Sequence, residues 1–338
     1  MPVQPRIISV HPAAVIAGGR LVIEGSGFAV DGPRLPEVLV GDERARVVAA
    51  SPTRITVLAP ALAESGRAPV RVEGVTGEPG HVDVAAACAT GLHQVDNPVF
   101  DREGNLYVTY SGTRGQEVPV SIFCVRPNGT RETFSSGIVN PTSMALDPDG
   151  QLYVSSRFEG TVYRVSDGGS TAFATDLGIA CGLAFAPDGT LFVGDRSGTI
   201  FAVDRDGHAR AFASLPASVA AFHLALAPDG DLYVAAPTLA THDAVYRIAP
   251  DGTVGVHYEG FGRPQGLAFD ANGTLFVVDA LAGGSGLYRF ATDGSPQLEL
   301  SGPGLIGIAF DPFGGYAVCT NESAFRLSPN EPLNRRAA

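Results

Sequence analysis

A nine-residue pattern recurs through most of this chain and restricts the fold more than any other feature. Each copy is a short apolar strand, a turn with an acidic residue before a glycine, and a second strand that ends in Val. The copies occupy residues 100–108, 146–154, 185–193, 226–234 and 269–277, with a degenerate sixth at 310–318. Their turn glycines recur about every forty residues, at Gly104, Gly150, Gly189, Gly230, Gly273 and Gly314. A period near forty with strand–turn–strand content predicts the blades of a β-propeller.

The charge and composition exclude several classes of function. The formal net charge is -12, and all 23 basic residues are arginine, because the chain contains no lysine. Sequence-independent binding to nucleic acid or an anionic membrane needs clustered positive charge, so we expect neither. Lysine chemistry such as Schiff-base formation is also excluded. The four cysteines (Cys88, Cys124, Cys181 and Cys319) lie far apart, and we expect them to be small buried apolar residues.

The sequence shows no run of about 18 apolar residues, so we expect no transmembrane helix. It opens without a charged region followed by an apolar segment, which is the pattern of a signal peptide. Localisation therefore stays open between a cytoplasmic protein and a secreted or periplasmic one whose leader has been removed.

Residues 1–85 differ from the repeats that follow. They contain six or seven short alternating runs separated by Gly and Pro turns, which predicts a β-sandwich. The segment resembles the IPT/TIG immunoglobulin-like domain at residues 5–12, 18–19, 23–28, 40–41 and 55–60. That resemblance implies a spacer or an interaction module rather than a catalytic domain.

The fold class predicted is therefore all-β, an immunoglobulin-like sandwich at residues 1–85 followed by a six-bladed propeller at residues 86–330 and a polar tail at 331–338. Each repeat supplies four strands, but the sixth lacks a good fourth strand. We expect residues near 88–93 to supply it, because a ring closed in this way leaves no open sheet edge.

The Asp-x-Asp-Gly turns of the repeats have oxygen atoms that suit calcium. Asp and Asn side chains also accept local backbone hydrogen bonds, and Gly supplies the positive φ of a tight turn. Because the turns recur in every repeat and lack the closing Glu of a calcium loop, we interpret them as turn devices.

In a propeller the innermost strands start around the mouth of a central channel, where ligands bind. Alignment of the repeats on that strand gives the predicted ligand-binding residues at two ring positions and in the adjoining loops. They are Asp96, Asn97, Thr142, Cys181, Phe222 and Gln265 at the ring positions, Tyr110 and Asn321 at the ends of the second strands, and Arg157, Arg196 and His242 in the loops that follow.

The propeller resembles the gluconolactonase/senescence-marker-protein superfamily and, equally, the NHL-repeat proteins, through residues 96–101, 181–189 and 264–267. In the lactonases, Glu, Asn and Asp at this ring position hold a divalent cation. Here the corresponding residues are Asp96, Thr142, Cys181 and Gln265, so one carboxylate remains. Such a set is a poor cage for Ca²⁺ or Zn²⁺, and we expect no cofactor, with Asp96 as the residual metal ligand if a cation binds.

Virginiamycin-lyase-like propellers use His and Glu at the same mouth, and His223 and His242 fall in the fourth repeat. We treat His223, Asp195 and Asp279 as the candidate catalytic acid/base groups. The alternative for His223 is a hydrogen-bonded channel histidine, and for the two aspartates it is the capping of turns.

Two functions follow from these observations. The first is a binding or scaffold protein whose propeller mouth engages a small molecule, a carbohydrate or a protein partner. The second is a lactonase- or lyase-type enzyme at the same mouth with a degenerate metal site. We favour the first, because only one carboxylate of the metal-binding set remains and because one fold can host many functions.

Overall fold

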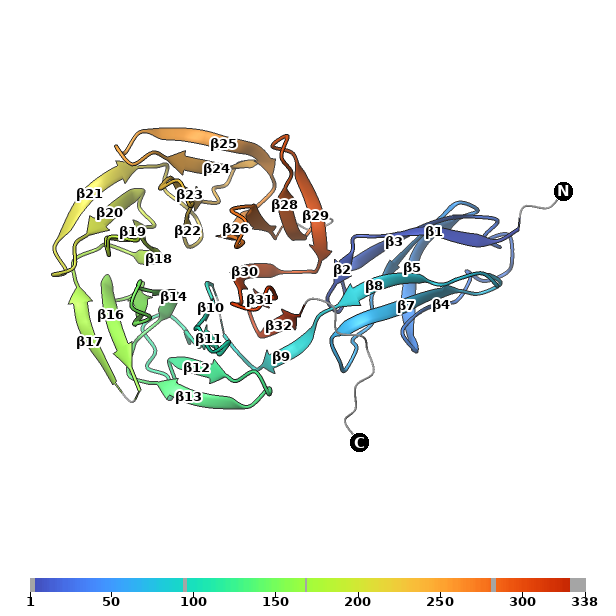
Figure 1. Cartoon of the computed structure of the whole chain (residues 1–338), viewed down its shortest axis with the longest axis horizontal. Coiled ribbons are helices and arrows are strands. Elements are labelled where there is room, and N and C mark those ends of the chain that lie inside the picture. Colours follow the sequence, from blue (N-terminus) through green and yellow to red (C-terminus); the bar gives the residue numbers. More distant parts are fainter. Residues whose placement is uncertain (1–3, 94–95, 168, 281–283, 329–338) are drawn as a thin grey trace.

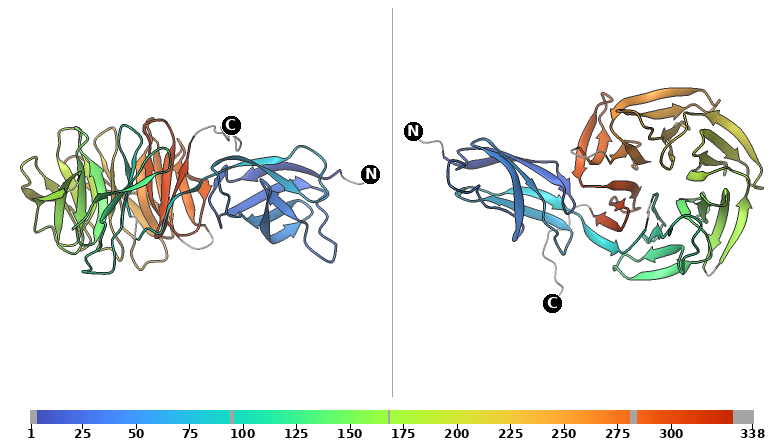
Figure 2. Two further views of the ribbon diagram at one scale, coloured as in Figure 1. Left: turned by 90° about the horizontal axis from the view of Figure 1, so that it is seen from below. Right: turned by 180° about the vertical axis from the view of Figure 1, so that it is seen from behind.

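The computed structural model describes residues 4–93, 96–167, 169–280 and 284–328, and all of its regular structure is β-strand. Figure 1 shows a ring of strands with an elongated domain attached to one side. Seen edge-on in Figure 2, that domain continues outward beside the disc rather than covering either of its faces. None of the described residues forms a helix of the length and hydropathy needed to span a membrane.

The N-terminal domain is a sandwich of two sheets linked along one side. Its first sheet has the order β1–β3–β6–β5 and its second the order β4–β7–β8–β2, with β4 also pairing with β5. The strands are β1 (Arg6–His11), β2 (Ala14–Val15), β3 (Arg20–Ser26), β4 (Val38–Val40), β5 (Glu43–Ser51), β6 (Arg54–Leu58), β7 (Gly66–Val72) and β8 (Gly80–Val84).

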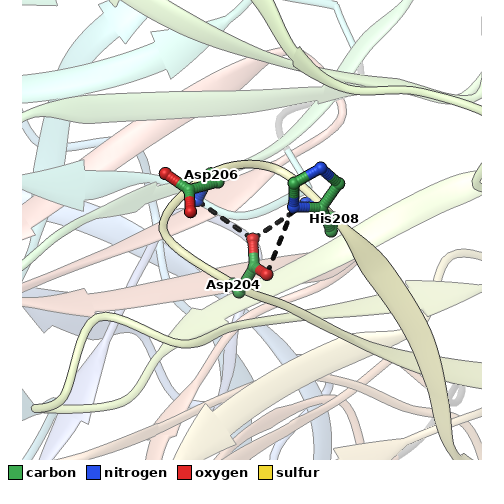
Figure 3. Close-up of side chains that lie close together, drawn as sticks. All are labelled: Asp204, Asp206 and His208. Atoms are coloured by element: carbon green, nitrogen blue, oxygen red, sulfur yellow. Dashed lines mark hydrogen bonds and ion pairs between the residues drawn. The ribbon is translucent and has the colours of Figure 1, made fainter.

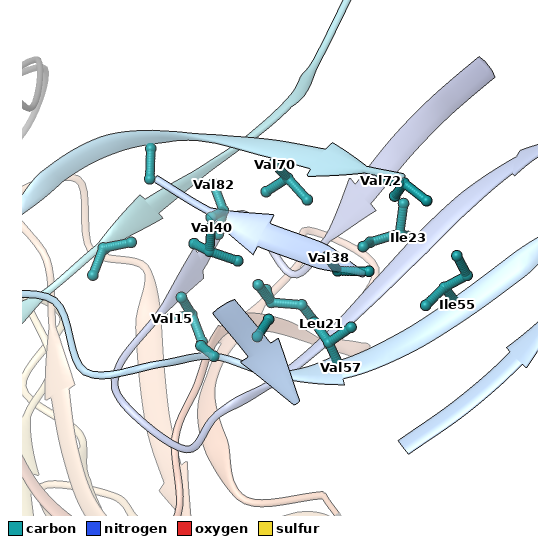
Figure 4. Packing of buried hydrophobic residues seen from close by; sticks show 14 of the residues in the cluster. Val15, Leu21, Ile23, Val38, Val40, Ile55, Val57, Val70, Val72 and Val82 are labelled. Carbon is teal, nitrogen blue, oxygen red and sulfur yellow. The ribbon is translucent and has the colours of Figure 1, made fainter. Parts of the chain in front are cut away.

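Alternation of apolar and polar residues builds the core of this sandwich. Along β3, Leu21 and Ile23 are fully buried while Arg20 and Glu24 are exposed, as a period of two requires. Valines and isoleucines from both sheets meet in one cluster, shown in Figure 4. The β-sandwich expected in the N-terminal part of the chain is confirmed, and its strands lie between Arg6 and Val84.

The rest of the described chain forms a β-propeller. Five separate four-stranded antiparallel sheets are present within the described ranges. Four of them consist of consecutive strands: β10 (Val99–Phe100), β11 (Leu106–Thr109), β12 (Ile122–Val125) and β13 (Arg131–Ser135); β14 (Pro141–Leu146), β15 (Leu152–Ser156), β16 (Thr161–Ser166) and β17 (Gly169–Ala174); β18 (Ala180–Phe185), β19 (Leu191–Asp195), β20 (Thr199–Val203) and β21 (Ala209–Ser214); β22 (His223–Leu226), β23 (Leu232–Ala235), β24 (Asp243–Ile248) and β25 (Val254–Phe261).

The fifth separate sheet joins the two ends of the propeller. It has the order β30–β31–β32–β9, built from β30 (Leu305–Phe310), β31 (Tyr316–Thr320), β32 (Ser323–Leu327) and β9 (Ala86–Thr90). Strand β9 pairs antiparallel with β32, so the segment that follows the sandwich supplies the outer strand of this sheet. Such a strand is expected from the sequence near residues 88–93, and in the structure it spans Ala86–Thr90.

The expectation of six separate blades needs correction. The fifth repeat forms β26 (Pro264–Phe269), β27 (Leu275–Asp279), β28 (Gly286–Phe290) and β29 (Pro296–Ser301), but these strands are not a separate sheet. They form one end of a twelve-stranded sheet that runs on through β2 and β8 into the N-terminal domain. In the ring, β26 packs between β22 and β30.

Strand β2 joins the two domains. Its two residues pair in parallel with β8 on one side and with β29 on the other, with Ala14 opposite Leu300 and Val15 opposite Ser301. Ser301 strengthens this joint, since its carbonyl accepts from Ile16 N at 3.1 Å and its hydroxyl accepts from Arg20 N at 2.8 Å. Main-chain pairing therefore fixes the sandwich to the propeller.

Gly19 is required at this joint, and its replacement gives a first prediction. A Cβ added to Gly19 would lie 2.2 Å from Ser301 O, which is backbone and cannot move away cheaply. We expect Gly19→Ala to lower the free energy of unfolding by about 2 kcal/mol in urea titrations. Gly77→Ala is the matched control, because its Cβ would meet nothing within 4 Å. Equal stabilities of the two variants would contradict the described joint.

Candidate functional site

The starts of the inner strands converge at one mouth of the channel. The closeness of neighbouring strands limits which side chains fit at each ring position. An added Cβ would meet backbone oxygen of the next inner strand at three glycines of the second ring position. The distances are 2.5 Å for Gly182 to Phe222 O, 2.6 Å for Gly266 to Ile306 O and 2.5 Å for Gly307 to Asp96 O. Neighbouring inner strands therefore approach closely, and the second ring position points at the next strand.

His223 occupies that position in the fourth repeat. Its side chain is 1% exposed, and neither ring nitrogen has a hydrogen bond. Gln265, at the start of the next inner strand, is the polar group that acts on it, but without the geometry of a hydrogen bond. Burial lowers the pKa of His223 to about 4, and Gln265 opposes that shift. The imidazole is therefore neutral at neutral pH, with two unsatisfied nitrogens.

Asp96 and Arg157 place charges around the Cys181 thiol. Burial raises the pKa of Asp96 to about 6, and the Arg157 guanidinium counteracts part of this effect. Burial, with the Asp96 carboxylate as the next cause, raises the pKa of Cys181 to about 12, whereas Arg157 and Arg196 lower it. Cys181 is therefore a neutral thiol rather than a nucleophilic thiolate. The charged groups of the first three repeats act on one another here.

Hydroxyl groups fix the inner strands of the second and third repeats. The Ser155 hydroxyl donates to Cys181 O at 2.5 Å, and Ser143 Oγ accepts from Leu183 N at 3.3 Å. The Thr142 hydroxyl donates to Asn140 O at 3.1 Å and is fully buried. Asn97 pairs with Ser143 in an isolated parallel bridge between neighbouring inner strands. Thr142 and Asn97 thus lie at the predicted ring positions, with their backbones or side chains already engaged.

Asp195 and Asp279 hold the loops that lead into the inner strands. Asp195 Oδ1 accepts from Ile179 N at 2.8 Å, and Asp279 Oδ1 accepts from Arg263 N at 2.7 Å. Asp279 Oδ2 also accepts from Gly262 N at 3.1 Å. Both carboxylates are buried and bonded to backbone amides, which corresponds to the capping role considered for them.

The remaining predicted residues divide between core and surface. Phe222 is fully buried in an apolar cluster with Leu224 and Leu232, so its ring packs between blades. Tyr110 packs edge-on against Phe123, with ring centroids 6.3 Å apart. His242, Asn321 and Arg196 are exposed loop residues, and the Arg196 side chain donates from Nε to Ser218 O at 3.1 Å.

Three exposed apolar side chains on the loops of this mouth were missed by the sequence analysis. They are Phe158, 53% exposed, Ile179, 39% exposed, and Leu239, 89% exposed. Phe158 directly follows Arg157, and Ile179 lies in the loop that Asp195 holds. Their positions in the sequence could have identified them, because each lies in a loop that the repeat alignment places at the mouth. Single exposed apolar side chains are common on protein surfaces, so these three add apolar area to the loops without defining a contact surface by themselves.

The other half of the channel is apolar. A cavity of about 330 Å³ opens among the later residues of the inner strands. The middle residues of these strands are all small or β-branched: Val99, Ala145, Ala184, Ala225, Ala268 and Ala309. Small apolar side chains thus line this part of the channel, while the acidic turn residues Asp101, Asp147 and Asp311 line a neighbouring pocket at the far ends of the inner strands.

A group of side chains with metal-ligand chemistry lies elsewhere, on the hairpin between β20 and β21. Asp204, Asp206 and His208 have ligand atoms within 4.8 Å of one another, and the structure describes no other such group of three in its ranges. Figure 3 shows them around one Asp-x-Asp-Gly turn. All three are exposed, and Asp204 Oδ1 accepts from the amides of Asp206 and His208. The geometry is that of the turn device expected from the sequence.

Comparisons with known proteins agree with this architecture. Residues 5–84 match the family model of the IPT/TIG domain. No curated protein matches the chain. A solved structure provisionally named a gluconolactonase is 18% identical, with 74% of this chain and 94% of that chain covered and a TM-score of 0.59.

Two further solved structures are similar. An auxiliary nutrient binding protein from Bacteroides ovatus is 13% identical over 97% of this chain and 99% of that chain, with a TM-score of 0.56. A streptogramin B lyase is 13% identical over 73% of this chain and 97% of that chain, with a TM-score of 0.54. At these identities the likeness concerns the fold: the propeller alone for the lyase, and the whole two-domain chain for the nutrient binding protein.

The raised pKa of Asp96 predicts that replacement of this residue increases the stability of the fold in a pH-dependent way. The unfolded chain releases this proton near pH 3.8 and the folded protein near 6, so Asp96 destabilises the fold as pH rises through this window. Asp96→Asn should match the wild type at pH 3.5 and exceed its unfolding free energy by about 3 kcal/mol at pH 7.5. Urea titrations at both values test this, and a difference independent of pH would contradict the burial of the carboxyl group.

Proposed function

We propose that this protein is a binding protein whose propeller mouth takes a small hydroxylated ligand, such as a carbohydrate. The observation that carries the proposal is His223, which is 1% exposed with both nitrogens unpaired. A buried polar group without partners costs about 1 to 3 kcal/mol. A ligand hydroxyl group can both donate to and accept from a neutral imidazole, and would recover that cost on binding.

The surroundings of His223 support this type of ligand. Gln265 adds an amide beside His223, and Asp96, Arg157 and Arg196 add charges of both signs around Cys181 in the neighbouring repeat. The exposed side chains of Phe158, Ile179 and Leu239 add apolar area to the mouth-side loops. Apolar and aromatic surfaces combined with a few oriented polar groups are typical of small-molecule sites.

The whole-length likeness to a nutrient binding protein gives this proposal its context. In this proposal, β26–β29 act as the sixth blade of the ring, because β26 packs between β22 and β30. The IPT/TIG-like domain would then be a spacer or a second contact, fixed to that blade through β2.

A lactonase- or lyase-type enzyme is the second candidate, and one observation favours it. His223 is neutral at neutral pH and Asp96 titrates near pH 6, so the mouth holds groups suited to take up or release a proton. Hydrolysis of aldonolactones with and without EDTA tests this candidate directly. Turnover that EDTA abolishes and Asp96→Asn removes would replace the binding proposal by the enzymatic one.

Substitution of His223 separates binding from folding. We expect His223→Leu to keep or raise the melting temperature, because an apolar residue replaces an unpaired buried polar one. The same variant should bind the ligand about 10-fold or more weakly, since about 1.4 kcal/mol corresponds to a factor of ten. Calorimetric titration with a panel of mono- and oligosaccharides provides the measurement.

His208→Leu is the matched control, because His208 is exposed on an outer hairpin. We expect it to leave the sugar affinity unchanged. An affinity that survives His223→Leu, or no binding by any sugar of the panel, would contradict the proposed ligand class.

A further inference from the structure

A second cavity lies where the N-terminal domain meets the propeller. Its volume is about 290 Å³, and both domains line it. His11, Arg20 and Val22 contribute from β1 and β3, and Leu298 and Ser301 contribute from β29. Ligand sites occur preferentially at such domain interfaces.

The two walls of this cavity are held in fixed positions. The β2–β29 pairing lies beside it, and Ser301, which is 4% exposed, accepts from Arg20 N at 2.8 Å. On the propeller side, Leu298 packs over Gly286, where an added Cβ would lie 2.4 Å from Leu298 Cδ1. The cavity is therefore preformed rather than opened by movement of the domains, which lowers the ordering cost of binding.

The strand register places the lining side chains on one face. His11 lies directly opposite Val22 in the β1–β3 ladder, and Arg20 is two residues before Val22 on the same strand. Directly opposed residues and residues two apart share a face of a sheet. This face thus presents an apolar centre, Val22, between two basic side chains, while Pro12 and Leu298 add apolar area.

The charges around the cavity are unbalanced. Arg20 and His11 are exposed, and no ion pair of either side chain occurs among the described residues. No acidic residue lines the cavity, although the whole chain carries a net charge of -12. Two acidic groups lie on the strands that line the cavity. Glu24 shares the face of Arg20 and Val22 on β3 but lies outside the cavity lining, and Glu299 lies 3.6 Å from Arg289 Nε in an ion pair of its own.

We infer that this junction is a second ligand site, which takes a small monoanion with an apolar body, of the class of aromatic or branched aliphatic carboxylates. The Arg20 guanidinium would bind the carboxylate, and Val22, Pro12 and Leu298 would cover the apolar body. A volume of about 290 Å³ lies at the lower end for ligand pockets and restricts the site to compact ligands. Because both domains contact the ligand, its binding stabilises their junction.

The test uses the full chain and three probes of one shape: benzoate, benzamide and benzylamine. We expect benzoate to bind in NMR titrations and to raise the melting temperature, with benzamide at least 10-fold weaker and benzylamine weaker still. Arg20→Gln should weaken the binding of benzoate at least 10-fold, because it removes the cation. The backbone hydrogen bond from residue 20 to Ser301 is kept in this variant. Arg210→Gln, an exposed arginine on β21, is the matched control and should change nothing.

Equal binding of benzoate and benzamide, or full benzoate affinity in Arg20→Gln, would overturn the inference. So would the absence of benzoate binding to the wild-type chain. His223→Leu identifies the site: benzoate affinity lost in that variant and kept in Arg20→Gln would assign the anion to the propeller mouth. The result is thus separate from the sugar titrations, which test the mouth alone.

Discussion

The close approach of neighbouring inner strands is the constraint on which the propeller depends. At Gly182, Gly266 and Gly307 the carbonyl of the next strand lies where a Cβ would otherwise be. This spacing brings the first residues of every inner strand into one ring at the channel mouth. His223 stands where these three repeats have glycine, and it is buried with both ring nitrogens unpaired. The feature that closes the ring thereby also buries the most unusual side chain of the site.

The repeats predict the propeller because each copy combines local turn chemistry with period-two alternation, and both signals are contained in nine residues. The twelve-stranded sheet could not be predicted in this way. Strand β2 has only two residues, and its partner β29 lies almost the full length of the chain away. A pairing that depends on such distant segments leaves no periodic signal, and it is this pairing that merges the fifth repeat with the N-terminal domain.

The candidate site shows a similar division. Alignment of the repeats placed Asp195 and Asp279 at the mouth. Their role as hydrogen-bond acceptors became visible only in the structure, where the amides of Ile179, Gly262 and Arg263 donate to them from other loops. Phe158 and Leu239 were missed because an apolar residue in a loop resembles a core residue until its exposure is known. The orphaned nitrogens of His223 likewise depend on which neighbours the ring supplies, and sequence spacing does not report that.

The way the chain closes on itself has a consequence for its synthesis. Strands β2 and β9 are synthesised before their partners β29 and β32. Until β29 and β32 have been synthesised, β2 and β9 each have an unpaired edge, and such edges invite association with other nascent chains.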